Sequence, residues 1–182
     1  MSDLIDFSDA MIPIEKVASA AKASLDRVRV YWPQLYTALG RYGIANGWTQ
    51  IAMIATVAVE TAHQFAPIHE YATGDAYEGR LDLGNAHTGD GRRFRGRGFI
   101  QITGRFNYRF YGERLGLDLE NSPDLALQPK VSADIAALYF VRRKIPAAAE
   151  AGDWRKVRKL VNGGYNGWDD FAGVLGRLGV VI

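Results

Sequence analysis

The spacing of apolar residues predicts a mainly helical chain. Apolar residues recur at intervals of three and four in segments 13–23 and 24–40, which is typical of amphipathic helices. Segment 50–64 is apolar on nearly every face, so we expect a buried helix there with Thr49 as its N-cap. Further helices are predicted over 104–115, 131–144, 154–161 and 168–178.

Segment 67–98 lacks this periodicity and is rich in glycine. Its glycines are Gly74, Gly79, Gly84, Gly89, Gly91, Gly96 and Gly98. We expect a long loop with at most one short hairpin, and loops of this length often carry function. Pro123 and Pro129 bracket a second loop. No repeat or linker divides the chain, so residues 1–182 are expected to form a single domain without a separate binding module.

The composition is that of a globular protein without cofactor motifs. Of 182 residues, 48% are hydrophobic and 23% charged, and no apolar run reaches the roughly 18 to 20 residues that span a bilayer. The absence of cysteine excludes disulfides and thiol chemistry. His63, His69 and His87 match no zinc signature, so we expect no metal and no other cofactor. The acidic N-terminus lacks the features of a signal peptide, which favours synthesis in the cytoplasm.

The net charge of +2 is unevenly distributed along the chain. Segment 80–114 has eight arginines and three acidic residues, and segment 142–159 has seven basic and two acidic residues. Each segment therefore carries +5, and the remainder of the chain is acidic. For the run 155–159 we favour a solvated basic face. The alternative is attraction to a polyanion, either nucleic acid or an anionic cell wall.

Three glutamates are candidates for acid–base chemistry. Glu60 lies near the end of the predicted buried helix, where a carboxyl group must be partnered, exposed in a cleft or protonated. Burial favours the protonated form, which suits a general acid, although Glu60 could simply end the helix on a solvated face. Glu70 follows on the loop, and Glu78 is its rival for a second carboxylate facing Glu60 across a groove. For Glu70 or Glu78 alone, a surface ion pair is the commoner explanation.

The segment 95–98, Arg-Gly-Arg-Gly, does not fit the common glycine-rich nucleotide motifs. It lacks the P-loop pattern, and Gln101 stands where a dinucleotide-binding motif needs its third glycine. We expect these glycines to let the backbone lie close beneath a ligand or another element. In an extended segment, Gln101 and Thr103 would point to the same face. Aromatic residues gather in the same region, and we expect a few of them to contact a ligand: Tyr71, Tyr77, Phe99, Phe106, Tyr108, Tyr111, Tyr165 and Trp168.

Taken in order, these motifs resemble family 19 glycoside hydrolases. The resemblance rests on a helix ending in Glu-Thr, a loop glutamate ten residues later, Gly-Arg-Gly-Phe-Ile-Gln-Ile-Thr-Gly-Arg-Phe-Asn-Tyr, and a later Val-Asn-Gly-Gly. It covers 51–178, and the Gly-Arg-Gly segment is its most specific part. The family comprises plant-type chitinases and related bacterial and phage lysozymes, and Tyr-Glu-Gly-Arg looks like the bacterial and phage branch.

The resemblance implies a mainly α, two-lobed lysozyme-like fold with a central substrate cleft and at most a short β-hairpin. Glu60 would be the general acid and Glu70 the general base of an inverting reaction, with Thr103 holding the attacking water; Glu78 is the alternative base. Substrate-binding positions are expected at Gln101, Tyr108, Asn162, Tyr71 and Arg97. Ala62-His63 departs from the Gly-Gly that many members have after Glu-Thr, and the Glu60–Glu70 spacing is about one residue longer than in compact members.

We therefore expect a single catalytic domain that cleaves the β-1,4 linkages of peptidoglycan, as a lysozyme or phage endolysin does. A chitinase of the same family and an inactive glycan-binding protein are the alternatives. The expected partner is peptidoglycan or a chitin-like polysaccharide, with no nucleic acid, no stable membrane insertion and a monomeric state. The protein would be made in the host bacterial cytoplasm and act on the wall after a holin-type or other export route.

Overall fold

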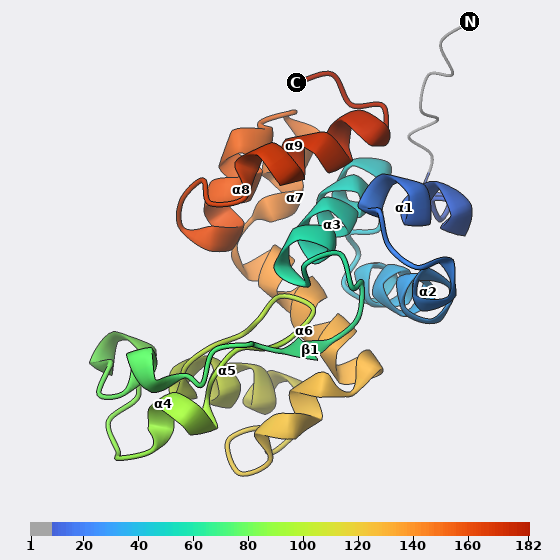
Figure 1. Ribbon diagram of the computed structural model, residues 1–182. Helices are drawn as coiled ribbons and strands as arrows, with labels where there is room; N and C mark the ends of the chain where they lie inside the picture. Colours follow the sequence, from blue (N-terminus) through green and yellow to red (C-terminus); the bar gives the residue numbers. More distant parts are fainter. Residues whose placement is uncertain (1–8) are drawn as a thin grey trace, which may run out of the picture.

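The computed structural model describes residues 9–182 and shows a mostly helical, two-lobed molecule, as expected (Figure 1). The helical lobe consists of α1 (Ile14–Ala21), α2 (Leu25–Arg41), α3 (Gly47–Glu60), α7 (Ile145–Glu150), α8 (Trp154–Asn162) and α9 (Trp168–Arg177). The second lobe consists of β1 (Ile68–His69), η1 (Asp75–Tyr77), η2 (Leu81–Leu83), α4 (Asp90–Arg93), β2 (Arg97–Gly98), α5 (Arg105–Leu115) and η3 (Pro123–Leu127). Helix α6 (Pro129–Arg142) contacts elements of both lobes and connects them.

Helix α3 lies at the centre of the helical lobe. It packs against α1, α7, α8 and α9, and all residues from Thr49 to Ala58 are buried. This confirms the buried helix that its apolar sequence predicts. The N-cap is Asn46 rather than Thr49, because the Asn46 Oδ1 atom accepts a hydrogen bond from the Thr49 amide at 2.9 Å. The helix ends at Glu60, earlier than its apolar pattern suggests.

The turn that follows α3 has an unusual backbone. Ala62, His63 and Phe65 have φ values of +47°, +62° and +50°, a region that residues other than glycine rarely adopt. Ala62 and His63 are the positions where the resemblance leads one to expect glycines. The His63 ring holds this turn in place through hydrogen bonds to the Ala21 carbonyl oxygen at 2.6 Å and the Asp170 carboxylate at 2.8 Å. The turn is thereby anchored to α1 and α9.

In the second lobe, strands β1 and β2 pair antiparallel and join the two ends of segment 67–98. Ile68 is opposite Gly98, and His69 is opposite Arg97. The expected short pair of strands therefore joins the two ends of the segment, and η1, η2 and α4 lie in the loop between the strands. The second predicted loop, which Pro123 and Pro129 bracket, contains the short helix η3. Helix α7 is a further difference, because the apolar pattern does not predict it. Within residues 9–182, no helix combines the length and apolar character of a membrane span.

Gly98 is required where β2 meets helix α6. Its φ is +90°, and a Cβ atom there would lie 2.6 Å from the Ser132 Oγ atom and 3.1 Å from the Ala126 carbonyl oxygen. The Ser132 Oγ atom also accepts a hydrogen bond from the Phe99 amide at 2.8 Å. A side chain at Gly98 would therefore disturb both the backbone and this contact between β2 and α6.

We expect Gly98→Ala to lower the free energy of unfolding by about 3 kcal/mol, because backbone strain and a steric clash act together. Gly43→Ala is the matched control, because Gly43 has a φ of +68° but no atom within 4 Å of an added Cβ. The control should cost only the backbone strain, about 1 kcal/mol. Denaturant unfolding measures both, and equal losses would contradict the steric argument.

Candidate active site

Glu60 and Glu70 line the same pocket, which lies at the junction of the end of α3 and the segment after β1. The pocket has a volume of about 320 Å³ and is lined by Val59, Glu60, Ala62, Ile68, Glu70, Tyr71, Tyr77, Gln101 and Thr103. The structure thus brings together five of the residues expected in the site from the sequence, contributed by both lobes: Glu60, Glu70, Tyr71, Gln101 and Thr103. A concave site with a few convergent polar groups is typical of ligand binding.

The Glu60 carboxylate is oriented by an ion pair with Arg158. The Glu60 side chain is 18% exposed, and its Oε1 atom accepts a hydrogen bond from Arg158 Nη1 at 2.6 Å. The other nitrogens of this guanidinium donate to the Asn166 carbonyl oxygen at 2.8 and 2.5 Å. Within residues 9–182, Glu60 Oε2 has no hydrogen-bond partner. One carboxylate oxygen is therefore held and the other remains available.

Arg158 corrects our interpretation of the basic run 155–159. The sequence favours a solvated face for the whole run, but the Arg158 side chain is only 3% exposed. A buried guanidinium needs several partners, and Glu60 and the Asn166 carbonyl supply them. No local signal identifies this residue, because its partner is 98 positions away in the chain.

Glu70 is held by one side-chain and one backbone donor. Its Oε1 atom accepts a hydrogen bond from the Tyr77 hydroxyl at 2.7 Å, and its Oε2 atom accepts one from the Gly96 amide at 3.0 Å. Burial raises the pKa of Tyr77 to about 12, and the hydrogen bond to Glu70 and its negative charge contribute. Tyr77 therefore keeps its proton at neutral pH and remains a donor to Glu70. The sequence places Tyr77 among the aromatics but assigns it no role.

Gly96 allows the backbone to lie directly against the side chains of Gln101 and Glu70. A Cβ atom at Gly96 would lie 2.9 Å from the Gln101 Oε1 atom and 3.1 Å from the Glu70 Oε2 atom. Any side chain there would displace one of them. This agrees with the expectation that a glycine in this segment permits a close approach.

Gln101 and Thr103 line the pocket, but they do not lie in the extended segment in which both side chains would point to the same face. The segment is a turn rather than a strand, and Gln101 has a φ of +53°. Gln101 Nε2 donates to the carbonyl oxygens of Ile68 at 2.9 Å and Gly98 at 2.8 Å. Thr103 Oγ1 donates to the Gln101 carbonyl oxygen at 3.0 Å. A backbone strained in this way at a pocket is typical of functional sites.

Three residues expected to bind substrate lie outside this pocket. Tyr108 is fully buried, and its hydroxyl donates to the Arg95 carbonyl oxygen at 2.7 Å. The Arg97 side chain is 7% exposed, pairs with Asp124 at 2.8 Å and donates to the Tyr108 hydroxyl at 3.0 Å. Neither is accessible to a sugar, so we correct their role to holding this loop in place. Asn162 is exposed at the end of α8, one helical turn beyond Arg158.

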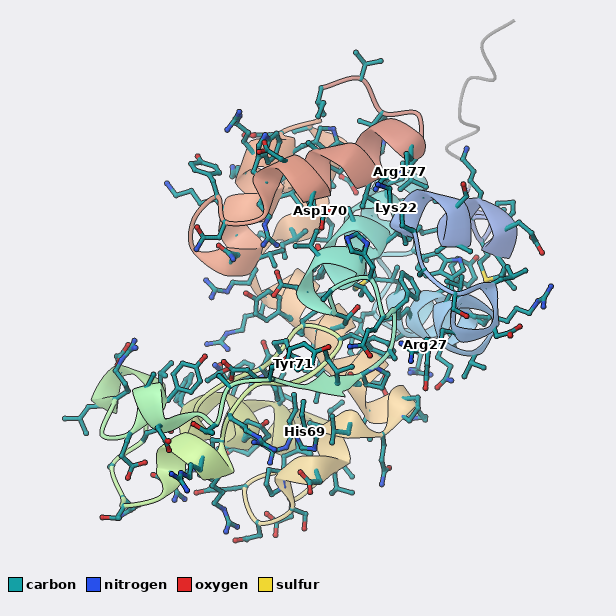
Figure 2. The ribbon with its side chains drawn as sticks, in the orientation of Figure 1. Lys22, Arg27, His69, Tyr71, Asp170 and Arg177 are labelled. Atoms are coloured by element: carbon teal, nitrogen blue, oxygen red, sulfur yellow. The ribbon has the colours of Figure 1, made fainter. Side chains whose placement is uncertain are left out.

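His69 lies on the side of β1 away from the pocket. Ile68, Glu70 and Tyr71 line the pocket, and Figure 2 shows His69 and Tyr71 on different sides of the strand. Burial lowers the pKa of His69, and the charges of Arg97 and Arg95 lower it further. His69 is therefore neutral at pH 7. Within residues 9–182, no three His, Asp or Glu side chains cluster as metal ligands.

Glu78, the rival second carboxylate, holds a loop instead of lining the pocket. Its Oε1 atom accepts a hydrogen bond from the Gly89 amide at 2.6 Å, and its Oε2 atom accepts one from the Gly91 amide at 2.8 Å. These bonds fix the start of α4 to the end of η1. The geometry therefore favours Glu70 over Glu78 as the partner of Glu60.

We expect Glu78→Gln to lower the free energy of unfolding by about 1 kcal/mol, because the amide can replace only one of the two accepting oxygens. Glu113→Gln is the control, because Glu113 is exposed on α5 and accepts no side-chain hydrogen bond within residues 9–182. Denaturant unfolding of both variants tests this. Equal stability of the two would show that the Glu78 contacts contribute nothing.

Two proteins with family 19 or chitinase-like names are similar to part of this chain in sequence. A Haemophilus influenzae protein named as containing a glycosyl hydrolase family 19 domain is 37% identical over 110 residues, covering 60% of this chain and 53% of that protein. Inactive chitinase-like protein 1 of Hevea brasiliensis is 35% identical over 83 residues, covering 41% and 26%. The chain therefore matches about half of the first relative and a quarter of the second.

The crystal structure of a bacterial family 19 chitinase has the same fold. It superposes with a TM-score of 0.72 at 20% identity, covering 94% of this chain and 97% of that one. The sequence profile described as chitinase class I, of glycosyl hydrolase family 19, matches residues 48–155, more than half of this chain. That range contains Glu60, Glu70, Gln101 and Thr103. The chain therefore belongs to glycoside hydrolase family 19.

Proposed function

We propose that this protein cleaves the β-1,4 linkages of peptidoglycan with inversion at the anomeric carbon. The observation that carries the proposal is that Glu60 and Glu70, from the two lobes, line one pocket. Glycoside hydrolysis requires one carboxyl group that protonates the leaving oxygen and a second group on the opposite face of the sugar. The same pocket also contains the Thr103 hydroxyl and the Gln101 amide.

In the proposed reaction, Glu60 donates a proton to the glycosidic oxygen as the bond between that oxygen and the anomeric carbon breaks. Its Oε1 atom is held by Arg158, so Oε2 carries the proton. Glu70 removes a proton from the water that attacks the anomeric carbon from the opposite face. The Tyr77 hydroxyl and the Gly96 amide hold the Glu70 oxygens, each of which keeps a further lone pair for the water. Thr103 helps to position this water.

Peptidoglycan is favoured over chitin because of the charge near the pocket. Peptidoglycan carries carboxylates, whereas chitin is a neutral polymer, and exposed cations of α8 lie beside Arg158. Such a substrate requires the protein to reach the cell wall, and we propose a holin-type or other export route. A chitinase remains the second candidate, because solved structures of the same fold are named as chitinases. An inactive glycan-binding protein is less well supported, since both carboxylates are present.

Product analysis tests the proposed reaction. Purified peptidoglycan and chitin oligomers are digested separately, and the new reducing ends are identified by mass spectrometry. We expect new reducing ends from peptidoglycan and a loss of roughly 10³-fold in kcat for Glu60→Gln, the scale of general acid–base catalysis. Glu70→Gln should be nearly as impaired. The fold should survive, because the glutamine oxygen can still accept a hydrogen bond from Arg158. Near-full activity of Glu60→Gln would exclude its role as the acid.

We expect Tyr77→Phe to lower kcat by roughly tenfold to a hundredfold, which corresponds to the loss of one hydrogen bond to a charged group. The variant keeps the aromatic ring that lines the pocket and removes only the donor to Glu70. Tyr36→Phe is the control, because the hydroxyl of Tyr36, on α2, donates to the Asp9 carbonyl oxygen away from the pocket. Steady-state kinetics on the same substrate compare the two. An unchanged kcat for Tyr77→Phe would show that this hydrogen bond does not orient the base.

A further inference from the structure

The two basic segments of the sequence, 80–114 and 142–159, differ in how many of their cations form ion pairs in the folded protein. In segment 80–114, five arginines form ion pairs with carboxylates: Arg80 with Asp82, Arg92 with Asp75, Arg97 with Asp124, Arg105 with Asp90 and Glu120, and Arg109 with Glu120. Most of that positive charge is therefore neutralised within the lobe. The segment 142–159 is different, because its exposed cations surround a pocket.

This second pocket has a volume of about 540 Å³ and is lined by four cations: Arg143, Arg155, Lys156 and Lys159. All four are exposed, and none forms an ion pair within the part of the chain that the structure describes. The pocket has one carboxylate, Asp153, whose Oδ1 atom caps α8 by accepting a hydrogen bond from the Lys156 amide at 3.0 Å. The pocket therefore has a net positive charge.

The same pocket also has apolar surface. Leu160 and Tyr165 contribute to its lining, and Tyr165 is 49% exposed. The Arg155 guanidinium lies 5.7 Å from the centre of the Tyr165 ring and 4.4 Å from that of Trp168. These contacts hold the arginine against the aromatic surface. Cations around an apolar floor suit a ligand that combines carboxylates with small aliphatic groups, such as a short peptide.

Helix α8 connects this pocket to the residue that holds Glu60. Arg155 and Lys159 lie within one helical turn of Arg158, whose guanidinium binds Glu60. Arg143 lies 5.3 Å from the centre of the Tyr139 ring, and the Tyr139 hydroxyl donates to the Val161 carbonyl oxygen of α8 at 2.5 Å. Figure 1 shows the turn after α8 and helix α4 on the same side of the molecule, one on each lobe. Because Arg158 of α8 contacts Glu60, a polymer bound at Glu60 would lie near the helix that carries Arg155, Lys156 and Lys159.

We propose that this pocket binds the carboxylates of the peptide substituents of a glycan strand bound at Glu60. The inference rests on the proposed peptidoglycan substrate and names the part of it that the enzyme recognises besides the sugars. A neutral amino-sugar polymer has no group for these cations. The pocket therefore makes the enzyme selective for the peptide-substituted strand.

The experiment compares Lys156→Gln/Lys159→Gln with a control of equal charge change. The control is Lys16→Gln/Arg29→Gln, on exposed positions of α1 and α2 outside the pocket. Each protein is assayed on peptide-bearing glycan fragments, on the same fragments with amidated carboxylates, and on chitin oligomers. We expect the pocket variant to lose roughly tenfold in kcat/KM for the carboxylate substrate relative to chitin oligomers, mainly through KM, as two solvent-exposed charge contacts would give.

Amidation of the fragments should abolish the difference in kcat/KM between the wild type and the pocket variant. High salt should have the same effect, because it screens exposed charges. The control variant should retain the selectivity of the wild type. An equal loss in both variants would overturn the proposal in favour of general attraction to polyanions. Equal or tighter binding of duplex DNA at physiological salt would overturn it in favour of a nucleic-acid surface.

A binding measurement separates this inference from the proposed function. In the Glu60→Gln background, in which turnover is expected to be roughly 10³-fold slower, peptide-bearing fragments are titrated with and without the two lysine substitutions. If the wild type cuts only chitin oligomers, the proposed function fails, but weaker binding of the fragments by the lysine variant still supports the pocket. If cleavage of peptidoglycan is found and the lysine substitutions leave its KM and this binding unchanged, the pocket assignment fails alone.

Discussion

The geometry of the candidate active site depends on one contact, between Glu60 at the end of the buried helix α3 and Arg158 of α8. Removing a guanidinium from water costs free energy, and here the carboxylate and the Asn166 carbonyl offset that cost. The same contact determines which Glu60 oxygen faces the pocket. Arg158 shares helix α8 with the exposed cations Arg155, Lys156 and Lys159, so one helix carries both the partner of Glu60 and the cations of the basic pocket.

The second lobe has little regular structure, and charged hydrogen bonds join its loops and short helices around a set of buried aromatic side chains. Hydrogen bonds from Arg109 and Arg105 lower the pKa of Glu120 to about 2, and Arg105 also lowers the pKa of Asp90. Because the folded-state pKa of Glu120 is lowered, its stabilising contribution is present above the usual glutamate pKa and is lost as the pH falls towards 2. Ion pairs of this kind neutralise five of the eight arginines of segment 80–114. By contrast, the four cations that line the basic pocket form no ion pair within residues 9–182.

Much of the helical lobe could be predicted from apolar periodicity, because each long helix buries a continuous face or, for α3, its whole surface. The six-residue α7 could not, because it is shorter than two turns and its alanines give no clear period. The N-cap of α3 was predicted wrongly because Asn46 is followed by glycine and tryptophan, before the apolar run begins. In the second lobe, the order comes from contacts such as Glu78 with Gly89 and Gly91, which no local pattern encodes.

The sequence by itself determined the family, the buried helix that carries Glu60 and the set of polar groups available for chemistry. Only the tertiary structure decided which of these groups meet. It placed Glu70 in the pocket and Glu78 outside it, buried Tyr108 and Arg97, and separated Arg158 from its exposed neighbours on the same helix. The physical reason is that burial and ion pairing depend on partners far away in the chain, whereas periodicity reports only on neighbours within a turn or two.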